Sequence, residues 1–209
     1  MIALPLVHRG NRAAAIAAGY VAFSILYLSA GHLPVRDPVE LAPGWLDRAL
    51  PFVPWSIWIY LSQFPLVFLA LWGGADDAAR SRAFYAMLVA TGLAFVTFVL
   101  YPTTGYPAIG RRPGEGLSGA TGVAYRALYR IDVATKWFPS LHVALASLAA
   151  ARWRARGRDA LLAAVGWASL VSLSTLTTKQ HYVADVLGGL GVAWLAHRLV
   201  ARWVACSTS

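Results

Sequence analysis

Residues 174–189, STLTTKQHYVADVLGG, place a histidine and a carboxylate at the junction of two long apolar segments. His181 and Asp185 are four residues apart, so on a helix they would share one face. A carboxylate in this position can hold one imidazole nitrogen and leave the other as a nucleophile or base. Asp185 is also the only acidic residue inside an apolar segment, where an unpaired carboxylate is costly. The pair therefore indicates either a structural hydrogen bond or a catalytic pair.

The composition is that of a membrane protein. Of the 209 residues, 58% are hydrophobic and 13% are charged, whereas about a quarter of a soluble domain is charged. Each apolar segment approaches the roughly 20 residues that a helix needs to cross a bilayer. We therefore expect an all-α integral membrane protein, a single domain over 1–209. The six predicted transmembrane helices are 13–33, 52–74, 83–102, 138–151, 159–177 and 182–204.

Basic residues predict the orientation of this bundle. Ten arginines fall in short segments on one side of the predicted membrane: Arg9, Arg12, Arg80, Arg82, Arg152, Arg154, Arg156, Arg158, Arg198 and Arg202. By the positive-inside rule this side is the cytoplasm, and both termini lie there. The long segment 103–137 then becomes an external loop. The Ala- and Arg-rich composition favours a bacterial inner (plasma) membrane.

The charge pattern and the cysteine content exclude other classes. The formal net charge is +9, but the arginines lie between apolar blocks and form no basic face for nucleic acid. The single cysteine, Cys206, excludes a disulfide framework and a cysteine-based metal site. No feature of the sequence predicts an oligomeric state.

A second polar stretch, KWFPSLHVALA (136–146), opens the fourth apolar segment. Pro139 and Ser140 suit the first turn of a helix, whose free N–H groups and dipole attract an anion. His142 would lie within one turn of that anion. The only two lysines of the chain, Lys136 and Lys179, each lie close in sequence to one of the two histidines. These cations are either snorkelling residues or ligands of the anion.

These residues resemble a known family. FPSLH (138–142) is similar to the second signature of the type 2 phosphatidic acid phosphatase (PAP2) superfamily, and STLTTKQHYVAD (174–185) resembles the third. The resemblance implies that His181 is the nucleophile, oriented by Asp185, and that His142 protonates the leaving oxygen. It also implies that Ser140 binds phosphate, that no metal or other cofactor is needed, and that the bundle resembles that of PAP2 enzymes and haloperoxidases.

The chain departs from the family pattern at several positions. Where the first signature has a lysine the chain has Gly105, although Arg112 and Pro113 follow as the pattern requires. The arginine expected after Ser174 is Thr175, and Leu141 replaces a glycine. Two phosphate-binding cations of the pattern are therefore missing. The predicted replacements are Lys179, Lys136, Arg111 and Arg112.

The resemblance implies a lipid phosphatase that hydrolyses a phosphate ester or diphosphate of a membrane lipid through a phosphohistidine intermediate, and two other functions remain open. FPSLH with TKQHY also resembles the branch with inositol phosphorylceramide synthases, which pass a phospho-headgroup to an alcohol instead of water. The predicted partner in either case is a lipid phosphate in the membrane. A small non-enzymatic transporter would explain intramembrane His and Asp but not the PSLH turn. Vanadium haloperoxidases share the signatures but are soluble, so the apolar segments disfavour them.

Overall fold

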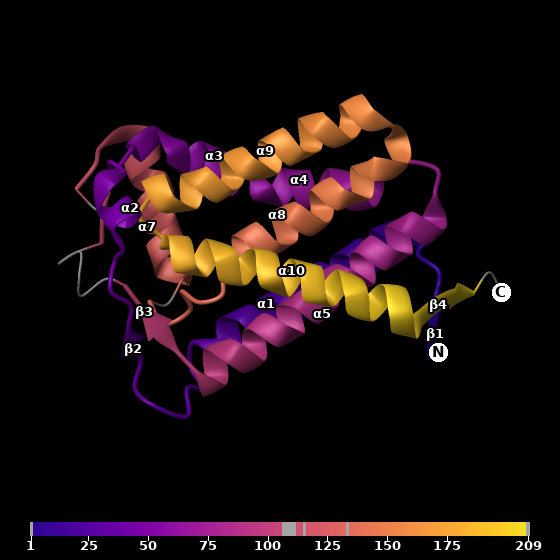
Figure 1. Cartoon of the computed structure of the whole chain (residues 1–209), viewed down its shortest axis with the longest axis horizontal. Coiled ribbons are helices and arrows are strands. Elements are labelled where there is room, and N and C mark those ends of the chain that lie inside the picture. Colours follow the sequence, from indigo (N-terminus) through magenta and orange to yellow (C-terminus); the bar gives the residue numbers. More distant parts are fainter. Residues whose placement is uncertain (1, 106–111, 115, 133, 208–209) are drawn as a thin grey trace.

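A computed structural model describes residues 2–105, 112–114, 116–132 and 134–207. The chain forms an elongated bundle of helices that run along its longest axis (Figure 1). Two short parallel strand pairs lie at opposite ends of this bundle. The long elements are α1 (Arg12–Ala30), α4 (Gln63–Trp72), α5 (Asp77–Leu100), α8 (Leu141–Arg152), α9 (Arg158–Thr177) and α10 (Val183–Trp203).

Five stretches of helix are long and apolar enough to cross a membrane: Arg12–Ala30, Pro54–Trp72, Asp77–Leu100, Arg158–Thr177 and Val183–Arg202. Together they identify a multi-pass membrane protein. The second stretch is not one continuous α-helix. A 3₁₀ turn, η1 (Pro54–Ser56), leads into α3 (Ile57–Leu61), and α4 follows after Ser62.

The fourth predicted span, 138–151, is shorter than expected. Helix α8 has 12 residues, which corresponds to about 18 Å, whereas the hydrocarbon core is about 30 Å thick. Residues 138–140 do not extend the helix, because Phe138 donates its N–H to the Thr103 hydroxyl and Ser140 donates its N–H to the Asp185 carbonyl. At the other end a 3₁₀ turn, η2 (Trp153–Arg156), follows. The sixth crossing therefore remains a prediction.

Helix α8 is the core of the bundle. It contacts α4, α5, α9 and α10, and nearly all of its residues from Leu141 to Ala150 are buried. A helix that is apolar on every face is stable only when other helices surround it. The outer helices instead expose large apolar side chains, including Val21, Leu162 and Leu187, which are 58–63% exposed. These outward faces suit contact with lipid.

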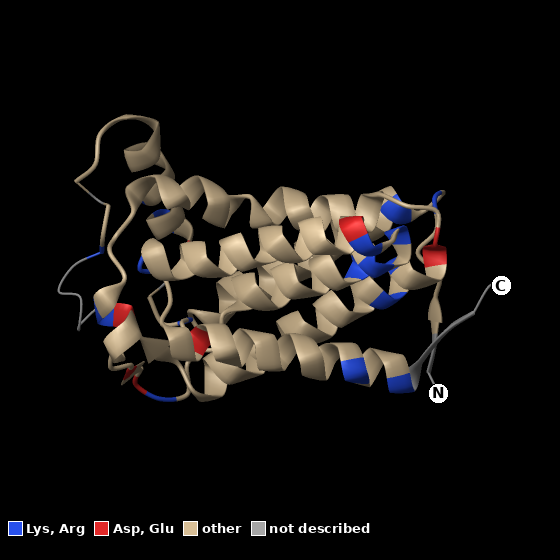
Figure 2. Ribbon diagram, turned by 45° about the horizontal axis from the view of Figure 1, so that its top comes forward, with Lys and Arg blue, Asp and Glu red and all other residues tan. Residues whose placement is uncertain are grey.

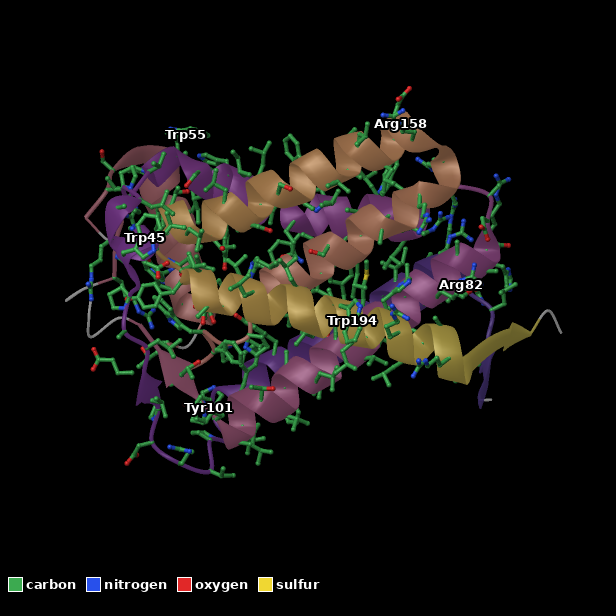
Figure 3. All side chains as sticks on the ribbon, viewed as in Figure 1. Trp45, Trp55, Arg82, Tyr101, Arg158 and Trp194 are labelled. Atoms are coloured by element: carbon green, nitrogen blue, oxygen red, sulfur yellow. The ribbon has the colours of Figure 1, made fainter. Side chains whose placement is uncertain are left out.

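Charged residues are separated along the bundle. Most Lys and Arg of the long helices gather at the end where both chain termini lie (Figure 2). There β1 (Ile2–Pro5) pairs in parallel with β4 (Val204–Ser207). Arg82 and Arg158 belong to this end, whereas Trp45, Trp55 and Tyr101 lie towards the other (Figure 3). The clustering matches the grouping of arginines that the sequence predicts. Which membrane face it occupies stays a prediction.

The opposite end carries the polar segments that surround the histidines. Here β2 (Val39–Glu40) pairs with β3 (Thr103–Thr104), and Thr103 also bridges to Lys136. Within the segment 103–137, the residues Gly119–Ile131 form helix α7. Helix α2 (Trp45–Ala49) completes this end. These elements fix the chain segments that lead into α8 and α10.

Close packing of α10 against the start of α8 generates a testable expectation. A Cβ atom at Gly189 would lie 2.4 Å from the Ser140 carbonyl oxygen, a backbone atom that cannot rotate away. We expect Gly189→Ala to destabilise the protein by about 1–3 kcal/mol, lowering its melting temperature in detergent by several degrees. Gly191→Ala is the matched control, because no atom lies within 4 Å of its Cβ position. Equal melting temperatures for the two variants would contradict this packing.

Candidate active site

The structure brings the two predicted histidines together. His142 lies in the first turn of α8, and His181 lies in the turn that precedes α10. Their ring centroids are 6.3 Å apart, although the residues are about forty positions apart in sequence. The backbone of Ser140 donates a hydrogen bond of 3.0 Å to the Asp185 carbonyl, which holds the starts of α8 and α10 side by side.

Asp185 also orients the segment that contains His181. Its Oδ2 atom accepts a hydrogen bond of 2.7 Å from the Tyr182 N–H and lies 3.5 Å from His181 Nδ1. The carboxylate is fully buried. The pairing predicted from the four-residue spacing is therefore formed, even though α10 begins only at Val183. His181 and Asp185 are therefore brought together by the turn that leads into α10 and not by one continuous helix.

Several buried polar atoms around this pair have no hydrogen-bond partner among the described residues. They are His142 Nε2, His181 Nδ1 and Asp185 Oδ1. His181 Nε2 likewise makes no hydrogen bond to any residue that the structure describes. Buried polar groups are normally satisfied, so unsatisfied ones need an explanation. A bound anion that carries oxygen acceptors would supply partners for protonated nitrogens at this position.

Two aromatic side chains hold the His142 ring. Tyr60 of α3 stacks on it at a centroid distance of 4.1 Å, and its hydroxyl lies 3.3 Å from His142 Nδ1. Phe64 of α4 meets the ring edge-on at 6.1 Å. Neither residue is predictable from the sequence, because an aromatic residue inside an apolar segment has no distinctive signal. Their contacts leave Nε2 as the nitrogen available for proton transfer.

Ser140 is the N-cap of α8, so it lies directly before the first turn in which the sequence places it. Its hydroxyl accepts a hydrogen bond of 3.5 Å from the Val143 N–H, and the residue is fully buried. Among the described residues, none accepts a hydrogen bond from the N–H groups of Leu141 and His142. Two free N–H groups at a helix N-terminus are suited to binding an anion. This position adjoins the His142 side chain.

Gly105, where the resemblance predicts a lysine, has no room for a side chain. The Trp137 ring fills the space beside Gly105, so that a Cβ atom there would lie 2.2 Å from the ring. Trp137 also meets the Tyr182 ring at 4.9 Å and the His181 ring at 6.2 Å. The Tyr182 hydroxyl in turn donates to the Gly105 carbonyl. Aromatic side chains therefore line this side of His181.

The two predicted lysines are engaged away from the histidine pair. The Lys136 ammonium donates to the Tyr27 carbonyl, lies over the Tyr27 ring and is 3.3 Å from Asp132. Burial lowers the pKa of Lys136, and the Asp132 carboxylate opposes this shift. The Lys179 ammonium donates to the carbonyls of Asp47 and Leu50. Lys136 thus links its segment to α1, and Lys179 links the turn before α10 to the C-terminal part of α2. Their part in phosphate binding remains a prediction.

The other predicted cations differ in position. Arg112 lies over the Tyr129 ring and donates to the Tyr129 carbonyl. The Tyr129 hydroxyl accepts a hydrogen bond from Gln180, the residue before His181. Arg112 is thereby connected to the histidine segment through two side chains. Arg111 lies outside the described residues.

Thr175, which stands where the resemblance predicts an arginine, supports the backbone of the turn before α10. Thr175 is fully buried, and its carbonyl accepts hydrogen bonds from the N–H groups of both Gln180 and His181. Its hydroxyl donates to the Ser172 carbonyl. Thr175 therefore shapes the turn that carries His181. Among the described residues, no group of three or more His, Cys, Asp or Glu side chains could hold a metal ion.

Comparison with known families agrees with these observations. A family model described as the PAP2 superfamily matches residues 37–199. The chain belongs to the PAP2 superfamily. The matched region includes both histidine segments and every long helix except α1. Comparisons with curated proteins and with solved structures give no match. Membership of this superfamily supports an activity of the phosphatase or phosphotransferase type.

The Trp137–Gly105 contact can be tested by introducing a lysine at position 105. We expect Gly105→Lys alone to lower the melting temperature, because Trp137 occupies the space that the new side chain requires. Trp137→Gly should relieve the collision, so that the double variant is more stable than the sum of the two single changes predicts. A coupling of at least about 1 kcal/mol is expected for residues in contact. Strict additivity would contradict the proposed collision.

Proposed function

We propose that the protein is a metal-independent lipid phosphatase. In this proposal it hydrolyses a phosphate ester or diphosphate of a membrane lipid through a phosphohistidine intermediate. The main support is the juxtaposition of His142, His181 and the buried Asp185 at one end of a membrane bundle. The unsatisfied nitrogens of both histidines and the free N–H groups of α8 would surround a phosphate here.

The first step forms the covalent intermediate. His181 Nε2 attacks phosphorus, and the bond from phosphorus to the lipid oxygen breaks. Protonated His142 gives its proton to that oxygen, so the lipid leaves as an alcohol. The Asp185 carboxylate, 3.5 Å from His181 Nδ1, would accept a hydrogen bond from that nitrogen and stabilise the cationic ring. Such contacts are often long before substrate binds and shorten with it.

The second step releases phosphate. His142, now neutral, takes a proton from water while the water oxygen attacks phosphorus. The phosphorus–nitrogen bond breaks, and its electron pair returns to His181. Tyr60 would hold the His142 ring in place through stacking and through the contact with Nδ1. The phosphate leaves with the enzyme restored.

Transfer to a lipid alcohol is the second candidate reaction, as in the inositol phosphorylceramide synthase branch. It differs only in the group that attacks the phosphohistidine. The aromatic and apolar surroundings of the histidines, with Tyr60, Phe64, Trp137 and buried Leu141, favour an apolar acceptor over free access of water. In both cases we propose a six-crossing topology in a bacterial inner membrane, with cytoplasmic termini and an external site.

Loss of His181 tests the proposal directly. We expect His181→Ala in purified protein to lower phosphate release from phosphatidate by at least about 10³-fold, because the covalent route disappears. Wild-type protein quenched during turnover should carry acid-labile, alkali-stable phosphate on His181. His197→Ala, which changes an exposed histidine at the opposite end, should keep full activity. Unchanged release by His181→Ala would overturn the mechanism.

The acceptor requires a separate measurement. Phosphatidate labelled in its phosphate, or an inositol phospholipid labelled in its phosphoinositol headgroup, is incubated with and without ceramide. Free labelled phosphate or inositol phosphate identifies hydrolysis, and a labelled ceramide product identifies transfer. We expect free phosphate to be the main product when water is the only acceptor. Formation of a labelled lipid at the expense of free phosphate would favour the transferase.

A further inference from the structure

An apolar groove lies between α1, α4, α5 and α8. It is partly open to the surroundings. Its lining side chains are apolar apart from Gln63, Tyr20 and Thr91. The described residues place no charged side chain in its wall. A groove of this kind is suited to hydrocarbon and poorly suited to water.

The groove shares a wall residue with the surroundings of the histidine pair. Phe64 belongs to its wall and also meets the His142 ring edge-on at 6.1 Å. Leu145, three residues after His142 on α8, also lines the groove. A ligand with its phosphate between the histidines would therefore have the groove directly beside it.

Gln63 is an unpartnered polar group in the wall of this groove. Its side chain is 3% exposed, and among the described residues none forms a hydrogen bond with its amide. The other two polar groups are already engaged, because Tyr20 donates to the Phe64 carbonyl and Thr91 donates to the Met87 carbonyl. The Gln63 amide is not among the fully buried polar atoms that lack a partner. A ligand oxygen within the groove would accept a hydrogen bond from it.

The order of the lining residues gives the groove a direction. Helices α1 and α4 run antiparallel, so Gln63 and Phe64 lie at the end near His142, and Ile16 and Leu71 lie at the far end. Along α4, the distance from Phe64 to Leu71 is about 10 Å. Val67 lies between them. A straight chain that enters beside His142 therefore passes Val67 before it reaches Leu71.

We propose that this groove binds one hydrocarbon chain of the lipid phosphate, with the Gln63 amide hydrogen-bonded to an ester oxygen near the headgroup. The proposal rests on the proposed function, and it defines the substrate class as an ester-linked lipid with a chain long enough to pass Val67. Burial of about 0.8 kcal/mol per methylene group supplies the affinity. Val67 and Leu71 then determine the preferred chain length.

Chain-length dependence tests the groove. Phosphate release is measured with dihexanoyl and dioleoyl phosphatidate, which share the same headgroup. Val67→Trp should raise KM for the dioleoyl lipid by at least about tenfold, the effect of excluding two methylene groups, and leave the dihexanoyl KM within about twofold. The matched control is Val21→Trp on the outer face of α1, where Val21 is 59% exposed. It should resemble wild type with both lipids. Equal changes for both lipids in Val67→Trp would overturn the proposal.

The Gln63 contact has its own test. Gln63→Leu keeps the approximate size of the side chain and removes the amide. We expect KM to rise roughly threefold to tenfold for diacyl phosphatidate, the effect of one hydrogen bond. It should stay unchanged for hexadecyl phosphate, which has no carboxylic ester. An equal rise for hexadecyl phosphate would exclude a specific contact with the ester.

Photo-labelling separates failure of this proposal from failure of the proposed function. Phosphatidate with a diazirine on one acyl chain is added to the catalytically blocked His181→Ala variant, so labelling does not require turnover. Labels on residues 63–71 and 84–91, reduced by Val67→Trp, support the groove even if wild type releases no phosphate. Labels confined to the outward faces of the helices would overturn it, even if wild type is an active phosphatase.

Discussion

The buried carboxylate of Asp185 is the constraint on which the site depends. A carboxylate without exposure to solvent must be paired or hydrogen-bonded, because an isolated buried charge is unstable. Here its Oδ2 atom binds the Tyr182 N–H and lies within ion-pair distance of His181, while its backbone carbonyl binds the Ser140 N–H. One residue thus fixes the turn before α10 and the first residue before α8. The two histidines are brought together as a consequence.

Small residues make this arrangement possible. Gly188 and Gly189 allow α10 to approach Phe138 and the Ser140 carbonyl more closely than any side chain would permit. The alanines of α8 serve the same purpose on its other faces, where α5, α9 and α10 pack. In a membrane, where apolar burial contributes little to helix association, such close van der Waals contact is the main source of stability. The site is therefore a product of backbone packing as much as of polar contacts.

At two positions where the resemblance predicts cations, the chain has Gly105 and Thr175. Trp137 occupies the space beside Gly105, and Thr175 supports the backbone of the His181 turn. Lys136 donates a hydrogen bond to a backbone carbonyl of α1, and Lys179 donates to backbone carbonyls in and directly after α2. Anion binding in the proposed mechanism consequently depends on ring nitrogens and the N-terminus of α8, with Arg112 nearby. Backbone N–H groups bind phosphate with fixed geometry, which suits a compact and partly apolar pocket.

The sequence alone determined the membrane class, the positions of five apolar helices within six residues, a helix start near Ser140 and the proximity of His181 to Asp185. These features follow from composition, from the length of apolar runs and from spacing along one chain segment, which are local properties. The start of α8 at Leu141 was not predictable, because Phe138 and Ser140 bond to residues distant in sequence instead of extending the helix. The contacts of Tyr60, Trp137 and the two lysines, and the groove between α1, α4, α5 and α8, arise from side chains on different helices. Only the tertiary structure decided them, since no local pattern specifies which faces of separate helices will meet.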